Sequence, residues 1–235
     1  MYALIELHDA NYQGLADLTW GQNKIPYAEL HGYKTFCRSD AADFVPNVGI
    51  GYQKIHYVKE LLETHPEVEW FWWTGTDTMI TNFGTRIQDR IDTQYHFIVA
   101  VDINGINADS FLVRNTPEGR GYIQHLLDIE EECSKHWDAE QRAMSVALGI
   151  PPTAEPWTED TEICDQYKDV VKLVPQRYMN SFNYKLYGNT YPDHNNDRFG
   201  WDGNWQLGDW LIHWPAVQLE YRMQLFNFYK EYIIK

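Results

Sequence analysis

The stretch Trp70-Phe71-Trp72-Trp73-Thr74-Gly75-Thr76-Asp77 joins four consecutive large aromatic residues to a small-residue turn and a single acid. The rings do not alternate with polar residues, so they predict a central strand covered on both faces, as in parallel sheets flanked by helices. In open α/β sheets the carboxyl ends of the strands face the ligand crevice, and Gly75 and Thr76 allow close approach to the backbone. Asp77 is therefore a candidate site residue, although acids at such junctions also commonly bond nearby amides.

The rest of the chain predicts an α/β fold in a single domain over residues 1–235. Strand-like and helix-like stretches alternate over the first two thirds, which is typical of βαβ units and a mainly parallel sheet flanked by helices. The expected strands are Tyr2–Leu7, Tyr33–Cys37, Glu69–Thr74, His96–Val101, Ser110–Arg114 and Trp210–His213. Helices are expected over the apolar stripe Ile55–Leu62, from Thr116-Pro117-Glu118 onward, over Asp138–Leu148 and over about 216–233. A long aromatic loop spans about residues 181–209, and its length favours a functional role.

The composition narrows the class of protein. The formal charge of −15 argues against a nucleic-acid surface, because long polyanions would be repelled. No apolar run approaches the roughly twenty residues of a membrane span. The cysteines are too widely spaced for a metal knuckle, so three reduced thiols are expected at Cys37, Cys133 and Cys164. Ten Trp, sixteen Tyr and ten Phe exceed what a core of this size needs, which favours a groove where rings stack on a ligand such as a sugar.

Two side chains could join Asp77 at a site. His213 ends a late apolar strand, where a neutral imidazole and a carboxylate could share a divalent cation; the alternative is an ordinary hydrogen-bonded or surface histidine. Lys54 is expected in the first turn of its helix, a position that disfavours a cation unless an anion docks there. The alternative is a helix that begins earlier, near Pro46-Asn47, with Lys54 in solvent.

Polar residues in two other segments allow two interpretations each. Asp102 ends a buried strand and Asn107 lies in the turn after it, so both could bind hydroxyl groups or could satisfy only their own turn. Asp138 and Gln141 fit a capping box, which explains Gln141 structurally. Glu140 is either a solvated acid of the first helical turn or a carboxylate that stabilises positive charge developing on a sugar.

Several segments resemble, in the same order, the galactosyl-, xylosyl- and mannosyltransferase family that includes fungal α-1,2-galactosyltransferases and plant xyloglucan xylosyltransferases. They cover about residues 27 to 215, and their shared order is more specific than any one motif. The segments are Tyr27–Tyr33, Tyr52-Gln53-Lys54, His65–Trp73, Asp102–Asn115, Glu140-Gln141, Pro175-Gln176-Arg177, Asn180 and Gly208–His213.

The resemblance implies a GT-A fold, a nucleotide-sugar donor with a uridine base favoured, Mn²⁺ or Mg²⁺ on the diphosphate, and transfer with retention at the anomeric carbon. By position, Asp77 would be the second acid of a DxD motif and would ligate the metal together with His213. Lys54 would face the diphosphate and Thr76 would lie beside the donor. The transferred sugar and the acceptor would be surrounded by Asp102, Asn107, Glu140, Gln141 and Gln176.

Two positions depart from the family pattern. Gly75 stands where DxD has its first acid, and Asp109 stands where a Gly is usual before the Ser-Phe pair. The loss of one carboxylate removes a potential metal or ribose contact. Asp109 is a candidate to replace it at the donor.

The expected function is a retaining glycosyltransferase that acts on a glycan or glycosylated protein. Retention requires front-side attack, with Glu140 or Gln141 stabilising the transition state, or a covalent adduct on Glu140; front-side attack is favoured. The alternative function is a catalytically inactive nucleotide-sugar or glycan-binding protein, with Gly75 as the mark of lost activity. Because the fungal and plant relatives are membrane-anchored and this chain starts at the fold, we expect a soluble cytoplasmic enzyme of bacterial or viral kind.

Overall fold

The computed structural model describes residues 1–152, 157–158, 160–186 and 196–235. Part of the aromatic loop expected over about 181–209 therefore lies outside the described residues. In the described part of the chain, no helix is both long enough and apolar enough to span a membrane. Cys37, Cys133 and Cys164 are free thiols, as expected.

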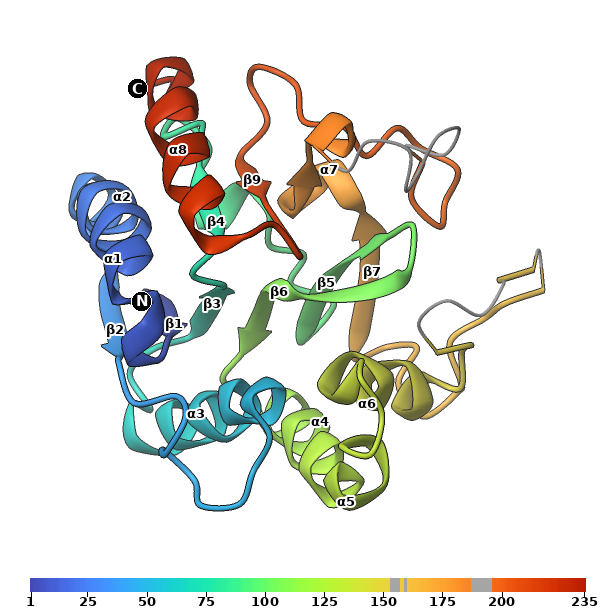
Figure 1. The fold of residues 1–235 in the computed structure, drawn as a ribbon. Helices are drawn as coiled ribbons and strands as arrows, with labels where there is room; N and C mark the ends of the chain where they lie inside the picture. The colour runs from blue at the N-terminus through green and yellow to red at the C-terminus, as the bar shows by residue number, and fades with distance from the viewer. Residues whose placement is uncertain (153–156, 159, 187–195) are drawn as a thin grey trace.

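A six-stranded sheet forms the centre of the fold, with strand order β2-β1-β3-β6-β5-β7 (Figure 1). Neighbouring strands run parallel except for β6, which is antiparallel to both β3 and β5. A tight turn connects β5 to β6, and only antiparallel strands can be joined by so short a connection. The predicted mainly parallel sheet is confirmed, with one antiparallel strand inside it. The strands are β1 (Tyr2–Leu7), β2 (Lys34–Arg38), β3 (Trp70–Thr74), β5 (Phe97–Asp102), β6 (Gly105–Arg114) and β7 (Val171–Pro175).

The aromatic strand β3 is covered on both faces, as its sequence predicts. Phe71 and Trp73 belong to a core cluster with residues of α3, α4 and α6, which Figure 1 shows together on one side of the sheet. Trp70 and Trp72 belong to a second cluster, which includes α2 and Trp210. Residues on opposite faces alternate along the strand, so each pair of rings fills a different core. The helices are α2 (Ile25–His31), α3 (Ile50–Thr64), α4 (Pro117–Asp128), α5 (Glu130–Cys133) and α6 (Ala139–Leu148).

A smaller sheet has the strand order β4-β9-β8. In it, the late strand β9 pairs with β4, which begins at the residue after Asp77. Its strands are β4 (Thr78–Ile80), β8 (Ser181–Phe182) and β9 (Leu211–His213), and Thr78 pairs with His213. A third core cluster packs helix α8 (Leu219–Tyr229) on this sheet. The C-terminal helix expected from about residue 216 begins later because Ala216 has a left-handed backbone, with φ of 56°.

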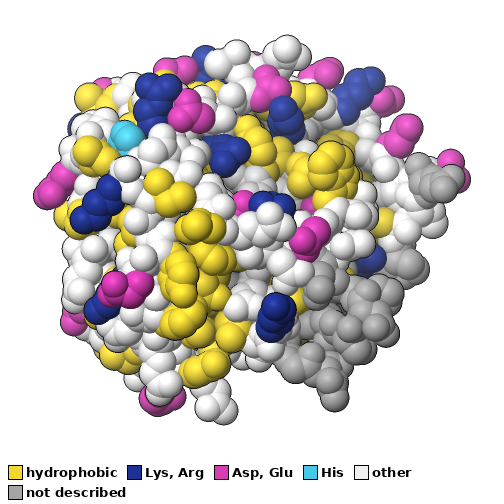
Figure 2. Space-filling model, turned by 90° about the horizontal axis from the view of Figure 1, so that it is seen from above, with side chains coloured by type: hydrophobic (Ala, Val, Ile, Leu, Met, Phe, Trp, Pro, Cys, Tyr) yellow, Lys and Arg dark blue, Asp and Glu magenta, His cyan; other side chains and the backbone are white. Residues whose placement is uncertain are grey.

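Short helical segments complete the described elements. They are a π-helical stretch η2 (Asp17–Lys24), the helices α1 (Gln13–Ala16) and α7 (Gln176–Met179), and 3₁₀ turns over Ala10–Tyr12, Ile87–Asp89 and Lys230–Tyr232. Figure 2 shows that, on the face seen from above, basic and acidic side chains are interspersed and hydrophobic side chains form patches between them.

Candidate active site at the carboxyl edge of the sheet

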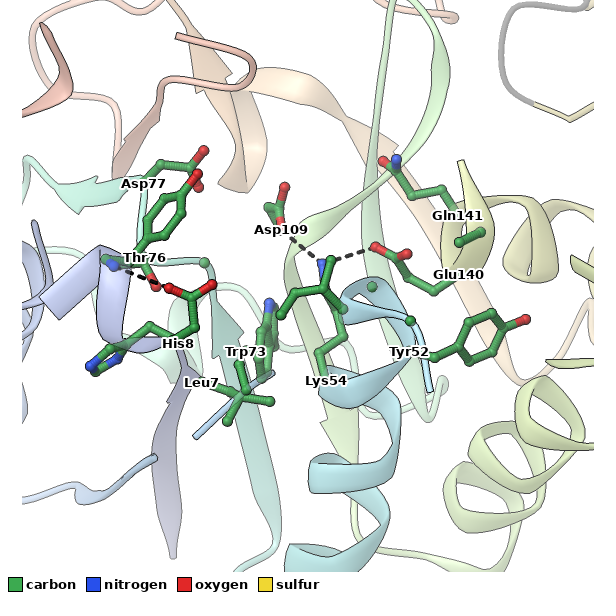
Figure 3. A pocket seen from close by; sticks show the side chains of 18 of the residues that line it. Leu7, His8, Tyr52, Lys54, Trp73, Thr76, Asp77, Asp109, Glu140 and Gln141 are labelled. Atoms are coloured by element: carbon green, nitrogen blue, oxygen red, sulfur yellow. Dashed lines mark hydrogen bonds and ion pairs between the residues drawn. The ribbon is translucent and has the colours of Figure 1, made fainter. Parts of the chain in front are cut away.

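A cavity of about 630 Å³ opens where the strands β1 and β3 end. Its wall includes residues from the loop after β3, the middle of β6, the N-terminal part of α3 and the first turn of α6. Figure 3 shows Asp109, Lys54 and Glu140 pointing toward one another. This is the edge at which ligands bind in open α/β sheets. Six of the residues expected at a site line this cavity: Lys54, Thr76, Asp77, Asp109, Glu140 and Gln141.

Asp77, Asp109 and His213 form a cluster beside the cavity. The Nε2 atom of His213 lies 3.4 Å from Oδ1 of Asp77 and 3.5 Å from Oδ2 of Asp109. One ligand atom from each residue lies within 4.8 Å of the others. The His213 ring is fully buried, and neither of its nitrogens has a hydrogen-bond partner among the described residues. A buried imidazole normally bonds through both nitrogens, so this cluster fits a divalent cation held by oxygen and nitrogen ligands.

Arg222, from helix α8, holds the other side of Asp77. Its Nη2 lies 2.9 Å from Oδ2 of Asp77, while its Nε donates to the carbonyl of Trp214 and its Nη1 to the hydroxyl of Tyr12. Burial favours the neutral acid, but the neighbouring His213 and Arg222 outweigh burial and hold the pKa of Asp77 below its ordinary value. Asp77 is thus ionised, and its Oδ1 faces the cluster.

The carboxylate of Asp109 occupies the space beside Gly75. A Cβ atom built on Gly75 would lie 3.2 Å from Oδ1 of Asp109 and 3.2 Å from Oδ1 of Asp77. Position 75 therefore faces the same point as the two acids. Positions 75 and 109 lie side by side because β3 and β6 are antiparallel neighbours and Thr74 pairs with Ser110. An acid at position 75 and the acid at position 109 would compete for one place.

Lys54 lies between two carboxylates at the centre of the cavity (Figure 3). Its Nζ is 2.8 Å from Oδ1 of Asp109 and 3.0 Å from Oε1 of Glu140. Burial opposes its charge, but the two acids outweigh burial and raise the pKa of Lys54 above its ordinary value. Helix α3 begins at Ile50, so Lys54 lies in the second turn and is only 8% exposed. Both expectations for its place in the helix were wrong: it is neither in the first turn nor in solvent.

Glu140 packs against the first turn of α3. A Cβ on Gly51 would lie 2.0 Å from Oε2 of Glu140, so only glycine leaves room for this carboxylate. An anion is stabilised there by the positive end of the helix dipole. An anion was expected to dock beside Lys54, and Glu140 of the chain itself lies there. Glu140 is 7% exposed, so the interpretation as a solvated acid is wrong.

The capping-box interpretation of Gln141 is also wrong. Asp138 makes no side-chain bond to the helix N-terminus; its Oδ1 accepts from Nε of Arg142. Gln141 instead accepts a hydrogen bond from the backbone N–H of Ala108 on β6, at 3.3 Å. The neighbouring strand offers Gln141 a partner that the local pattern does not contain, and its side chain lines the cavity.

Asp102, Asn107 and Gln176 do not line this cavity. Asp102 accepts from the N–H of Asn104 and from Nδ2 of Asn107. Asn107 was expected in the turn but lies on β6. Burial raises the pKa of Asp102 despite those bonds. Gln176 is fully buried, and its Oε1 accepts from the hydroxyl of Tyr184.

Sequence reasoning missed Arg222 and Tyr12, which also line the cavity. Arg222 is one of nineteen Lys and Arg residues and carries no local motif, so no signal in the sequence distinguishes it.

The fold is that of the GT-A glycosyltransferases. A glycosyltransferase involved in the glycosylation of the major capsid of PBCV-1 superposes with a TM-score of 0.67 at 14% identity, covering 97% of this chain and 98% of that one. At this identity the match establishes the fold alone.

Sequence comparison confirms the resemblance to the family found from the motifs. Residues 10–94 match the sequence profile of the galactosyl transferase GMA12/MNN10 family. An uncharacterized alpha-1,2-galactosyltransferase of Schizosaccharomyces pombe is 32% identical over 42% of this chain and 36% of its own length. Xyloglucan 6-xylosyltransferase 2 of Arabidopsis thaliana is 28% identical over 40% of this chain and 22% of its own length. The matched part is less than half the length of each relative.

Proposed function

We propose that this chain is a retaining glycosyltransferase that moves a hexose or pentose from a nucleotide-sugar donor to a glycan or glycosylated-protein acceptor. The observation that carries the proposal is the cluster of Asp77, Asp109 and His213 beside Lys54, at the carboxyl edge of a GT-A sheet. The family profile and the fold both support glycosyl transfer.

In this proposal, Asp77, Asp109 and His213 hold Mn²⁺ or Mg²⁺. When bound, the cation supplies positive charge against the diphosphate leaving group. Lys54 is proposed to face the diphosphate on the same side, with its charge shared with Asp109 and Glu140. The net charge of −15 would repel a diphosphate, so the cation supplies the main compensation. Thr76, beside Asp77, borders the donor.

Glu140 and Gln141 are proposed to face the transferred sugar. Both line the cavity close to Lys54, and a carboxylate there can stabilise an oxocarbenium-like transition state. Retention by front-side attack needs no covalent bond to Glu140. Trapping a glycosyl adduct on Glu140 would contradict this mechanism. Asp102, Asn107 and Gln176 remain proposed donor or acceptor contacts by resemblance, set back from the cavity wall.

The acceptor would enter along an aromatic border. Trp137 lines the cavity and is 77% exposed, and Tyr12 lies on the wall as well. An exposed indole beside a polar pocket is suited to stack on the flat face of a sugar ring.

A screen of donors tests the proposal. UDP-galactose, UDP-xylose, UDP-glucose and GDP-mannose are each incubated with the protein, with Mn²⁺ or with EDTA, and the released sugar is measured. We expect cation-dependent release from at least one donor, and its loss in Asp77→Asn. Asp165→Asn is the matched control, because the Asp165 side chain is 96% exposed. Saturable donor binding without any released sugar would favour the inactive binding protein instead.

The replacement of the first DxD acid by Gly75 is the one feature that favours an inactive protein. The carboxylate of Asp109 lies within 3.2 Å of where a side chain at position 75 would begin. A carboxylate is thus still present at this point of the site, which supports the proposal that activity is retained.

A further inference from the structure

A second group of possible metal ligands lies on the paired strands β1 and β2. Glu6 and Cys37 are register partners in this parallel pair, so their side chains project from the same face of the sheet. His8 follows Glu6 by two residues, and its N–H donates to the carbonyl of Arg38, which extends the ladder past the end of β1. The alternation of side chains along a strand therefore places all three residues on one face.

The distances within this group suit a tetrahedral ion. Nδ1 of His8 lies 3.4 Å from Oε1 of Glu6 and 3.7 Å from Sγ of Cys37. One ligand atom from each residue lies within 4.8 Å of the others. Ordinary zinc bond lengths place neighbouring tetrahedral ligand atoms about 3.4–3.6 Å apart.

The buried carboxylate of Glu6 has an oxygen without a hydrogen bond. Glu6 is fully buried; its Oε2 accepts from Nζ of Lys24 at 2.6 Å, whereas Oε1 has no hydrogen-bond partner in the described part of the chain. A buried carboxylate oxygen left unbonded is costly unless it has another partner. Oε1 is the oxygen that faces His8.

The remaining nitrogen of His8 is supported as a ligating histidine requires. Nε2 lies 3.3 Å from Oε1 of Gln13, an acceptor, so Nε2 can donate its proton there. In the neutral tautomer with this proton, the lone pair of Nδ1 faces Glu6 and Cys37 and can bind an ion. Figure 3 shows the His8 ring turned away from Lys54 and Glu140. A separate cavity of about 240 Å³, lined by His8, Gln13 and Cys37 among others, gives access from solvent.

We propose that Glu6, His8 and Cys37 bind a thiophilic transition-metal ion of the Zn²⁺ class, with its fourth position open to water from this cavity. A thiolate ligand selects such an ion over Mn²⁺ or Mg²⁺, so this site is distinct from the cluster of Asp77, Asp109 and His213. As the metal–sulfur bond forms, the S–H proton of Cys37 leaves to solvent, and no electron is transferred. The ion would clamp the ends of β1 and β2. The inference does not depend on the proposed glycosyl transfer.

Cobalt substitution tests the site directly. The metal-free protein is titrated with Co²⁺, and we expect a thiolate-to-cobalt charge-transfer band, which a site of carboxylates and imidazole cannot give. Cys37→Ser should abolish the band and weaken Co²⁺ binding by at least about 100-fold. Loss of a residue that only supports a ligand costs up to about 100-fold, so loss of a ligand itself should cost at least as much. Cys164→Ser, also a partly exposed thiol, is the matched control and should leave the band unchanged. Asp77→Asn should leave it unchanged too, which separates this site from the donor site.

A measurement on the unaltered chain covers the case in which Cys37→Ser fails to fold. Zn²⁺ should slow alkylation of Cys37 by iodoacetamide, read by peptide mass, while alkylation of Cys164 proceeds at the same rate. Equal rates at Cys37 with and without Zn²⁺, or a cobalt spectrum without a thiolate band, would overturn the proposal.

Discussion

At the scale of single residues, the exchange between positions 75 and 109 can be tested by reversing it. Asp109→Gly should weaken Mn²⁺ binding by about 10-fold or more, because the cluster loses one of its carboxylates. The double variant Gly75→Asp/Asp109→Gly should recover most of the affinity, since a Cβ at position 75 points at the place that Asp109 vacates. Isothermal titration with Mn²⁺ measures both.

The single variant Gly75→Asp is the control for this exchange. Its Cβ would already lie 3.2 Å from Oδ1 of Asp77 and of Asp109, so a third carboxylate would crowd two others, where like charges repel. We expect it to be less stable than the double variant. If the double variant binds Mn²⁺ no better than Asp109→Gly, Asp109 does not replace the missing acid.

Arg222 is predicted to position Asp77 for the cation. Arg222→Lys keeps the positive charge but cannot hold Asp77, Trp214 and Tyr12 together, because an ammonium lacks the planar fork of a guanidinium. We expect Mn²⁺ affinity to fall by about 10-fold. Since the charge is unchanged, such a loss reports orientation alone. Arg142→Lys, which alters a similar ion pair with Asp138 away from the cavity wall, should bind Mn²⁺ normally.

A neutral variant adds a pH readout. Arg222 is one of the two groups that hold the pKa of Asp77 below its ordinary value. In Arg222→Gln that pKa should rise, so protons should compete with Mn²⁺ at a higher pH than in the unaltered chain. Affinity that falls at the same pH in both proteins would show that Arg222 does not act on Asp77.

At the scale of elements, the sequence predicts where strands lie better than it predicts which strands and side chains they contact. The rings of β3 fill two cores, as their lack of polar alternation predicts, and β1 has the predicted bounds. The direction of β6 was not predicted, although Asn104-Gly105 between apolar residues is a hairpin signal that implies it. The position of the Gln141 side chain is set by its hydrogen bond to Ala108 on β6. Arg222 contacts Asp77, which lies 145 positions earlier in the sequence (222 minus 77). Such tertiary contacts override local patterns and leave no local trace.

The first turn of α3 is predicted to fix Glu140. Through helix propensity alone, Gly51→Ala should stabilise the helix by up to about 1 kcal/mol. Its new Cβ, however, would meet Oε2 of Glu140 at 2.0 Å and push the carboxylate from Lys54. A displacement of about 1 Å can cost on the order of 100-fold in rate. We expect kcat to fall while Mn²⁺ affinity is unchanged, because Glu140 lies outside the metal cluster.

Gly121→Ala on helix α4 is the matched control. A Cβ there would meet nothing within 4 Å, and Gly121 does not line the cavity. Its kcat should equal that of the unaltered chain. Equal kcat values for the two alanine variants would show that the position of Glu140 does not limit catalysis.

At the scale of the whole molecule, the charge of the chain opposes the proposed diphosphate substrate, and the cavity wall itself carries more acids than bases. The net charge is −15, yet two basic side chains on the cavity wall, Lys54 and Arg222, are buried and paired with acids. Asp77, Asp109 and Glu140 offset these two charges, so Lys54 and Arg222 alone give a diphosphate little uncompensated positive charge. The acids of the cluster need a cation before they can tolerate that anion.

A divalent cation should therefore stabilise the folded chain. The cluster brings two acids and His213 together only in the fold, so Mn²⁺ at about 100 times its Kd should add about 2.7 kcal/mol to the free energy of unfolding. For a chain of this size, the melting temperature should rise by about 5–10 °C, as measured by differential scanning calorimetry.

Because a protein this acidic also attracts counterions nonspecifically, the comparison is made between two variants that lose one acid each. Asp77→Asn should lose most of the shift, whereas Asp165→Asn, which removes an exposed acid, should keep it. If both variants keep the full shift, Mn²⁺ stabilises the chain through its general charge, and the assignment of Asp77 as a ligand is wrong.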